Sequence, residues 1–215
     1  MDVLLCGLMG YSVGCFNPAY LIGSRKGIDV RKEGSGNAGA SNMVLLFGAK
    51  AGLITAVLDI LKAYFVTSLA ACILPACAVA KEVAAAFCVL GHMFPATMKF
   101  KGGKGLACMV GGVLAYNKRL FIRLAILEIA AALILDYIIV ITISLACILP
   151  ALYILSGGSL AVGILFAAVG VVVIYKHRAN IERIANGTEV RISYLWNREK
   201  ETKRVKENMD EEEAV

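Results

Sequence analysis

Charged residues are scarce in this chain of 215 residues, where only 18% are Asp, Glu, Lys or Arg and 59% are hydrophobic. A soluble domain has about a quarter of its residues charged and just under half apolar, so a water-soluble single domain is excluded. Intrinsic disorder requires low hydrophobicity, and a disulfide-rich secreted module is short and polar, so both are excluded too. A small polytopic membrane protein remains, and its net charge of +6 must lie outside the apolar segments.

Several targeting and catalytic patterns are also missing. No Lys or Arg precedes the first apolar stretch, which follows Met1 and Asp2, so it lacks the basic region of a signal peptide. The seven cysteines all lie in apolar segments without a C-x-x-C pair, which favours packing roles over a metal site. The chain shows no acidic metal cluster and no Ser-His-Asp or Cys-His set. The sequence therefore predicts no metal, no cofactor and no covalent intermediate.

Seven apolar segments approach the roughly 20 residues of a spanning helix. They cover approximately residues 3–24, 50–74, 79–98, 104–116, 120–135, 138–156 and 159–175. The sequence therefore predicts an all-α, polytopic integral membrane protein with about seven transmembrane helices. Because the fourth and fifth segments are short, five spans with a re-entrant hairpin are an open alternative.

Charge orients these segments through the positive-inside rule. Four basic residues lie between positions 25 and 32, directly after the first segment, so we expect the N-terminus outside and this loop in the cytoplasm. Alternation then places Lys99, Lys101 and Lys104 inside, together with the tail that starts at Lys176. Three basic residues between positions 118 and 123 would lie outside and disagree with the rule.

Polar stretches with glycines stand out at three expected cytoplasmic ends, and they hold both histidines of the chain. They run over residues 34–42, 91–105 and 177–189. In the first, Gly34, Gly36 and Gly39 form a G-x-G-x-x-G pattern, but a dinucleotide fold needs a preceding strand and this stretch follows an apolar helix. Successive glycines still let backbone N–H groups bind an anion, and a helix that starts near Ala40 would add its dipole.

The second stretch combines glycine with positive charge. We expect Gly102 and Gly103 to expose backbone donors and Lys101 and Lys104 to supply cations, which suits a phosphate. It is not a Walker A loop, since Gly105 follows the lysine where Ser or Thr should stand. A flexible loop with positive-inside charges is an equally good interpretation.

The remaining candidates are histidines and an ionisable pair. His177 and Asn180 would share a helix face, where His177 donates to a phosphate or an oxyanion or acts as a base, unless the stretch is only a polar helix end. We expect His92 to bond a backbone carbonyl. Asp59 and Lys62 lie deep in an apolar segment, so they must neutralise each other or line a polar cavity.

The three stretches closely resemble three motifs of the bacterial membrane acyl-phosphate:glycerol-3-phosphate acyltransferases, the PlsY family. The resemblance covers nearly the whole chain, and Asp59 and Lys62 also match the family's Asp-x-x-Lys. It implies seven helices with the N-terminus outside, and transfer of an acyl chain from acyl phosphate to the 1-hydroxyl of glycerol 3-phosphate. The products would be lysophosphatidic acid and phosphate, in membrane phospholipid synthesis.

The resemblance also implies roles for residues at the matching positions. The catalytic residues would be Ser35, Lys104, His177 and Asn180. The phosphate-binding residues would be Gly34, Gly36, Asn37, Gly39, Asn42, Gly102 and Gly103, with Asp59, Lys62, His92, Lys101 and Arg178 in support. Leu45 stands where the family has an arginine that is expected to grip a substrate phosphate bidentately, which leaves acceptor affinity open. Arg31, Lys32 and Arg178 are candidates to replace its charge.

We therefore expect a single membrane-embedded catalytic domain over residues 1–197 and a charged, solvated cytoplasmic tail over 198–215. The enzyme would act on acyl phosphate and glycerol 3-phosphate at the cytoplasmic side of the bacterial inner membrane, in contact with the lipid bilayer and without nucleic acid. A transporter or binder of phosphorylated metabolites, and a paralogue with a different acyl acceptor, are the alternatives. Acyl chain length and oligomeric state are left open, a monomer included.

Overall fold

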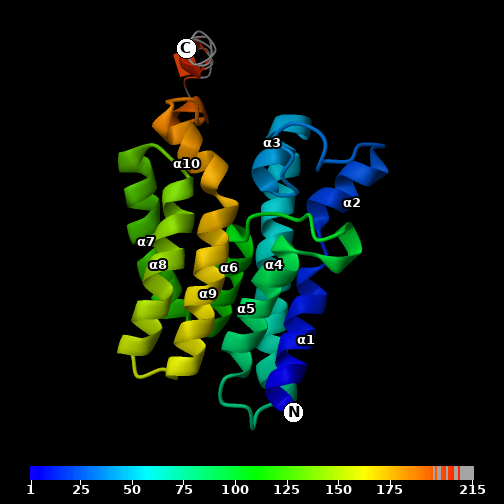
Figure 1. The fold of residues 1–215 in the computed structure, drawn as a ribbon, viewed down its shortest axis with the longest axis vertical. Helices are drawn as coiled ribbons and strands as arrows, with labels where there is room; N and C mark the ends of the chain where they lie inside the picture. Colours follow the sequence, from blue (N-terminus) through cyan, green and yellow to red (C-terminus); the bar gives the residue numbers. More distant parts are fainter. Residues whose placement is uncertain (196, 198–199, 202, 206–207, 209–215) are drawn as a thin grey trace. The chain divides into compact units, whose positions relative to one another are not determined.

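A computed structural model describes residues 1–195, 197, 200–201, 203–205 and 208, and this part of the chain is helical without a strand (Figure 1). It divides into two compact units. Unit 1 is Met1–Ile122 with Ser159–Leu165, and unit 2 is Arg123–Gly158 with Phe166–Val215. The all-α fold expected from the sequence is confirmed for the described residues.

The expected apolar segments all lie in helices. Unit 1 contains α1 (Asp2–Gly14), α2 (Pro18–Arg25), α3 (Ala40–Phe47), α4 (Ala49–Ile73), α5 (Ala80–Met93), the short 3-10 helix η1 (Ala96–Met98) and α6 (Leu106–Tyr116). Most of unit 2 consists of α7 (Lys118–Leu135), α8 (Ile139–Leu155), α9 (Leu160–Lys176), α10 (Arg178–Ala185) and the 3-10 helix η2 (Ile192–Leu195). The first residues of α7 and α9 belong to unit 1. The helix expected near Ala40 begins at that residue.

Asn17 explains why the first apolar segment forms two helices. Its side-chain oxygen accepts a hydrogen bond from the Tyr20 N–H at 2.8 Å and caps α2, and Pro18 follows at the first helical position. The Asn17 Nδ2 also donates to the carbonyl oxygen of Ala38, at 3.0 Å. The cap therefore ties the start of α2 to the first polar stretch.

Fewer helices reach membrane-spanning length than the seven expected. Among the described residues, Asp2–Arg25 taken as one span and α4 are long and apolar enough to cross a membrane. The pair α9 and α10, bent by 50° where His177 separates the two helices, is a third candidate. Helices α6 and α8 are apolar but shorter. Seven crossings would therefore have to include short or bent helices.

Small residues let α1 and α5 pack closely in unit 1 (Figure 1). Cβ atoms built at Gly10 and Gly14 would overlap the backbone of Ala84 and Cys88 on α5. Gly91 of α5 meets the α1 backbone in the same way. Close backbone approach through small residues is a common way for membrane helices to associate. It brings the C-terminal end of α5 against the break that follows α1.

A small hydrophobic core lies beneath the polar loops of unit 1. It consists of Ala19, Val30, Ala38, Met43 and Met98, all nearly or fully buried. These residues come from α2, the segment between α2 and α3, α3 itself and η1. The loops that follow α2 and α5 therefore share one apolar support.

In unit 2, α8 contacts both α7 and α9. Ser144 on α8 donates to the buried Glu128 of α7, and Gly170 on α9 closely approaches the α8 backbone. At the turn between α7 and α8, the Asp136 carboxylate accepts hydrogen bonds from the N–H and the hydroxyl of Ser193, each at 2.8 Å. The α7–α8 turn and η2 therefore lie at the same end of unit 2.

Gly10→Ala is expected to destabilise unit 1 by about 1–3 kcal/mol, because the new methyl group meets the Ala84 carbonyl and overpacking costs about that much. Gly7→Ala is the matched control, since its new Cβ would lie 3.5 Å from the Phe87 ring, an ordinary contact. Thermal unfolding of the purified variants in detergent measures the difference. Equal midpoints for the two variants would contradict the close packing of α1 on α5.

Candidate functional site

A cluster of three ionisable side chains lies buried where α4 meets α5. The Lys62 Nζ lies 2.7 Å from Oδ1 of Asp59 and 3.0 Å from Nδ1 of His92. The same ammonium donates to the carbonyl oxygens of Phe16, at 2.5 Å, and Gly14, at 3.2 Å. Each of the three residues is at most 7% exposed. One cation thus contacts four acceptor atoms from three parts of the chain.

The cluster decides between the two interpretations of the Asp59–Lys62 pair. The two charges neutralise each other by direct contact, three residues apart on α4, and Nδ1 of His92 lies 3.3 Å from the same carboxylate oxygen. The expected bond from His92 to a backbone carbonyl is wrong for Nδ1, which faces Asp59 and Lys62 instead. The reason is that the packing of α5 turns this ring towards two charges on α4. His92 therefore links α5 to the buried ion pair.

Asp59, His92 and Cys108 place potential ligand atoms within 4.8 Å of one another, a spacing that a metal ion can use. However, Lys62 contacts two of these atoms directly and supplies the positive charge of the cluster. The Cys108 Sγ lies 3.7 Å from the carbonyl oxygen of Asp59. A lysine at the centre makes this set fit an internal ion pair better than a metal site. The absence of a metal requirement stays a prediction.

Asn42 organises the first polar stretch from within. Its Oδ1 accepts from the Ser35 N–H at 2.8 Å, and its Nδ2 donates to the carbonyl oxygens of Val30 and Glu33 at 2.8 and 3.1 Å. The side chain is fully buried and both amide hydrogens are used. A direct phosphate contact by Asn42, as the motif implies, would require breaking these bonds. In this structure Asn42 supports the loop.

The tip of the first stretch is open to solvent. Gly34, Ser35 and Gly36 are exposed, and the two glycines have φ values of +60° and +68°, a left-handed conformation that favours glycine. Asn37 is half-buried, and Gly39 is buried at the N-cap of α3. The Ser35 hydroxyl is thus presented on a loop whose backbone is fixed from below.

Arg31 joins the first stretch to the second. Its guanidinium contacts both carboxylate oxygens of Asp29, at 2.8 and 2.7 Å, and donates to the carbonyl oxygen of Met98 at 2.8 Å. It also lies over the Tyr20 ring, 4.8 Å from the centroid. The hydrogen bonds from Arg31 lower the pKa of Asp29 to about 2, so this contact is kept at neutral pH and lost as the pH falls towards that value. Arg31 is therefore paired with Asp29, and its replacement of the charge missing at Leu45 stays a prediction.

The glycines of the second stretch cap α5 instead of exposing their N–H groups. The Gly102 N–H donates to the carbonyl oxygen of Met93 at 3.2 Å, and the Gly103 N–H to that of His92 at 3.1 Å. Both glycines are buried, and a Cβ at either position would overlap the carbonyl or the ring of His92. Their expected donation to a phosphate is therefore wrong in this structure. The last carbonyls of a helix need donors, and this loop supplies them.

The lysines are the charged groups that this second stretch presents. Lys101 is exposed, and Lys104 is half-buried directly before Gly105, the N-cap of α6. A Cβ at Gly103 would lie 3.0 Å from the carbonyl oxygen of Ala38, so the first and second stretches meet. An anion at this junction would contact side chains more than backbone N–H groups.

His177 and Asn180 lie in unit 2, at the bend between α9 and α10. His177 is the N-cap of α10, only 5% exposed, and its Nδ1 lies 2.8 Å from the carbonyl oxygen of Val173. Because a carbonyl can only accept, we assign a hydrogen to Nδ1. Asn180 lies in the first turn of α10 and donates to Oε1 of Glu189 at 2.6 Å. The helix break at His177 thus replaces the single helix face expected for the two residues.

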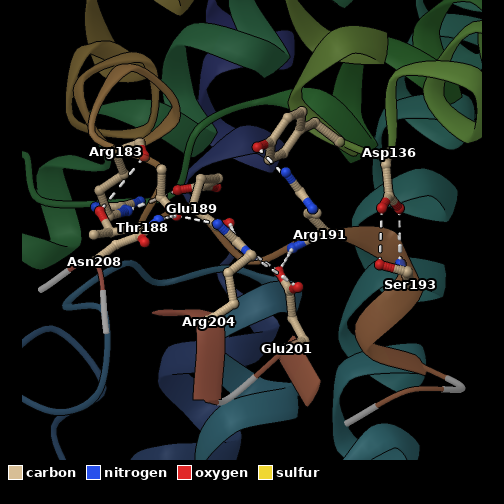
Figure 2. A network of polar contacts seen from close by, with 11 residues as sticks. Asp136, Arg183, Thr188, Glu189, Arg191, Ser193, Glu201, Arg204 and Asn208 are labelled. Atoms are coloured by element: carbon tan, nitrogen blue, oxygen red, sulfur yellow. Dashed lines mark hydrogen bonds and ion pairs between the residues drawn. The ribbon is translucent and has the colours of Figure 1, made fainter. Parts of the chain in front are cut away.

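The third stretch has hydrogen-bond and ion-pair partners that the sequence did not predict. Arg183 contacts the other carboxylate oxygen of Glu189 at 2.7 Å, and Arg178 donates to the Tyr175 carbonyl oxygen at 3.2 Å. The last described residues of the chain also contact this region (Figure 2). Among them are Glu201, Arg204 and Asn208. No local spacing marks these partners, because their contacts arise from the way the chain turns after α10.

The tail expected over residues 198–215 is therefore not simply solvated. Glu201 is 5% exposed, and its carboxylate accepts a hydrogen bond from the Arg191 N–H at 3.0 Å. The solvated interpretation is wrong for this residue and for Arg204, which contacts it, because specific pairing buries charges that composition alone assigns to water. Residues 198–199, 202, 206–207 and 209–215 of the expected tail lie outside the described residues.

Apolar helices with polar loops gathered at one end of unit 1 define the chain as a helical membrane protein whose loops carry the chemistry. A family model described as glycerol-3-phosphate acyltransferase matches residues 4–187. The chain belongs to this family, and the resemblance inferred from its motifs is confirmed. It is therefore an acyltransferase, and the alternative of a non-enzymatic transporter is not needed.

Relatives cover the chain almost completely. A glycerol-3-phosphate acyltransferase of Bacillus subtilis is 35% identical over 196 residues, which cover 91% of this chain and 100% of the relative. That of Sinorhizobium fredii is 38% identical over 191 residues, with 88% and 92% covered. The crystal structure of PlsY (YgiH), an integral membrane glycerol 3-phosphate acyltransferase in its glycerol 3-phosphate form, matches with a TM-score of 0.80 and 29% identity, over 91% of this chain and 98% of that one. Its lysophosphatidic acid form matches with a TM-score of 0.77 and 28% identity, over 91% and 97%.

Lys62→Met is expected to destabilise the protein by about 3–5 kcal/mol, because it leaves the Asp59 carboxylate buried without its cation. Adding Asp59→Asn to Lys62→Met is expected to recover part of this loss, since both charges are then gone. Thermal midpoints in detergent measure both effects. Lys50→Met, the same substitution at the exposed start of α4, is the control and should change stability by less than about 0.5 kcal/mol. A double variant no more stable than Lys62→Met would contradict the role of the ion pair.

Proposed function

We propose that this chain transfers a fatty acyl group from acyl phosphate to the 1-hydroxyl of glycerol 3-phosphate, giving lysophosphatidic acid and phosphate. The observation that carries the proposal is the junction of two polar stretches in unit 1, which bear the exposed Ser35 and the cations Lys101 and Lys104. The related PlsY structures are a glycerol 3-phosphate form and a lysophosphatidic acid form, which agree with the proposed acceptor and product.

The chemistry suits a site built from positioning and charge. An acyl phosphate is a mixed anhydride, so its carbonyl carbon is activated and phosphate leaves readily. The acceptor oxygen bonds to this carbon as the bond from the carbon to the phosphate oxygen breaks, and the hydroxyl proton passes to a substrate phosphate. In the proposal, Lys104 offsets the charge of the departing phosphate and Ser35 donates to a phosphate oxygen. The protein thus holds two anionic groups together without a covalent intermediate.

We further propose that His177 and Asn180, both in unit 2, take part in the reaction, as the family resemblance implies. The His177 ring is buried, its Nδ1 lies 2.8 Å from the Val173 carbonyl oxygen, and in the proposal this ring hydrogen-bonds a reacting group. The Asn180 amide carries both donor and acceptor atoms, which suits a contact with a reacting head group. In the proposal these two residues orient the reactants.

We place this site at the cytoplasmic side of the bacterial inner membrane, in a single domain over residues 1–197 with seven crossings and the N-terminus outside. In unit 1, the contact of Arg31 with Met98 puts the loops after α2 and α5 at one end. Cys6 and Ala80 share a core at the other end, where α1 begins and α4 turns into α5. This alternation agrees with successive crossings by α1–α2, α4 and α5, and the basic residues of the two loops favour the cytoplasm.

Unit 2 supports the same topology. The contact of Asp136 with Ser193 puts the α7–α8 turn at the end where the chain emerges after α10. A crossing by each of α7, α8 and α9 requires this pairing, because two crossings separate the α7–α8 turn from the end of α9. The basic residues near the start of α7 would then lie outside, against the positive-inside rule.

Purified protein supplied with acyl phosphate and glycerol 3-phosphate is expected to form lysophosphatidic acid, measured by mass spectrometry, with or without a metal chelator. Lys104→Ala is expected to lower turnover by about 10²–10³-fold, because the leaving charge loses its cation. Lys50→Ala, which removes the same charge from the exposed start of α4, is the matched control. No product from folded wild-type protein would contradict the proposal. Product formed only with another acceptor would make this chain a paralogue with a different substrate.

Leu45 gives a separate test of the acceptor site. It is 60% exposed on α3, at the position where the family pattern has an arginine. Leu45→Arg is expected to lower the KM for glycerol 3-phosphate about tenfold, because a bidentate guanidinium–phosphate pair contributes roughly 1.5 kcal/mol or more. Leu45→Lys is the control, since a point charge without the planar fork should give a smaller gain. Equal KM values for the three enzymes would show that the acceptor phosphate binds elsewhere.

A further inference from the structure

The chain continues beyond the residues matched by the family model, and its last described part folds back onto the third polar stretch (Figure 2). The family match ends at residue 187, and the segment 187–193 follows it. Glu201, Arg204 and Asn208 all contact this segment within unit 2. We call these three residues the C-terminal clamp.

Arg204 is the centre of the clamp. Its Nη1 donates to the carbonyl oxygen of Gly187, and its Nη2 donates to that of Glu189 at 2.8 Å. On its other side, Nε and Nη2 pair with the Glu201 carboxylate at 2.9 and 2.5 Å. One planar guanidinium thus holds two backbone carbonyls while an acid three residues earlier neutralises its charge. The single ammonium of a lysine cannot reproduce this fork.

Glu201 and Asn208 hold the same segment from both ends. The Glu201 carboxylate accepts from the Arg191 N–H at 3.0 Å, and the Asn208 amide donates to the Gly187 carbonyl oxygen at 2.9 Å. The hydrogen bonds from Arg204 lower the pKa of Glu201, so this carboxylate is ionised at neutral pH. The backbone from residue 187 to residue 191 is therefore fixed by three side chains of the clamp.

The clamped segment carries Glu189, the partner of Asn180. The Glu189 carboxylate accepts from Nδ2 of Asn180 at 2.6 Å and from Nε of Arg183 at 2.7 Å. The Glu189 N–H donates to the Arg183 carbonyl oxygen at 2.9 Å, so α10 also holds this residue. Because the Asn180 amide is bonded to Glu189, a displacement of residues 187–191 changes the direction of that amide.

We propose that Arg204 and Glu201 are positioning residues for acyl transfer, which set the direction of the Asn180 amide through Glu189. The proposal rests on the function proposed above, in which Asn180 contacts a reacting head group. A catalytic group misplaced by about 1 Å can cost on the order of 10²-fold in rate. The C-terminal clamp therefore contributes to turnover without touching the substrate.

Arg204→Met in the full-length chain is expected to lower kcat about tenfold and to change the KM for acyl phosphate less than about twofold, because positioning acts in the transition state. In an Asn180→Ala background, the same substitution is expected to change kcat by less than about twofold, since the group it positions is gone. Enzyme concentration is raised until the product of Asn180→Ala exceeds the blank. Lys200→Met, which removes an exposed cation next to Glu201 in the sequence, is the matched control and should leave kcat unchanged.

Equal losses in both backgrounds would overturn the proposal, because Arg204 would then stabilise unit 2 without acting through Asn180. No loss in the wild-type background would overturn it as well. Glu201→Gln preserves the side-chain shape and replaces Arg204→Met if that variant does not fold, with a smaller kcat loss that again disappears in Asn180→Ala.

Amide hydrogen exchange measures how firmly the clamp holds the backbone of residues 187–191, and it does not depend on catalysis. Exchange over residues 187–191 is expected to rise in Arg204→Met and to stay unchanged in Lys200→Met, because only the first removes contacts to that backbone. Unchanged exchange in Arg204→Met would also overturn the proposal. A wild-type enzyme that makes no product would count against the proposed function, whereas failure of the clamp alone would leave wild-type turnover intact.

Discussion

The ammonium of Lys62 is the contact on which unit 1 depends. Among helices that face lipid, an unpaired charge and an unmatched carbonyl are both costly. Lys62 removes both costs, because it neutralises the Asp59 carboxylate and donates hydrogen bonds to the carbonyl oxygens of Gly14 and Phe16. Those two carbonyls belong to the break after α1, where Asn17 starts α2 and reaches the first polar stretch. A charge buried among helices therefore stabilises the backbone from which a polar loop begins.

The second polar stretch takes its position from the same cluster. His92 contacts Lys62 through its ring, and its backbone carbonyl accepts the Gly103 N–H. Arg31 then connects the two stretches through Met98, above the small apolar core that they share. The loops that would meet charged substrates are thus positioned by contacts beneath them, while Ser35 and Lys101 are exposed.

Much of this arrangement can be predicted from the sequence, and there are physical reasons why the rest cannot. Low charge and long apolar runs predict the helices, and the spacing of Asp59 and Lys62 predicts their contact, because residues three apart on a helix are neighbours. Glycine patterns do not say which acceptor a backbone N–H will find, so Gly102 and Gly103 suggested an open phosphate loop where they cap a helix. A run of charges likewise suggests a solvated tail, since composition cannot reveal that Arg204 meets carbonyls 15 and 17 residues earlier.

The buried ion pair also bears on how the protein is made. Chains emerge from the ribosome N-terminus first, so Asp59 and Lys62 enter the bilayer together, three residues apart, and insert as a neutral pair rather than as two charges. Their carbonyl partners in the α1–α2 break are already in place, whereas His92 arrives thirty residues later. We therefore expect α4 to pack first against α1 and α2, which are synthesised before it. Its contact with His92 forms only when α5 follows.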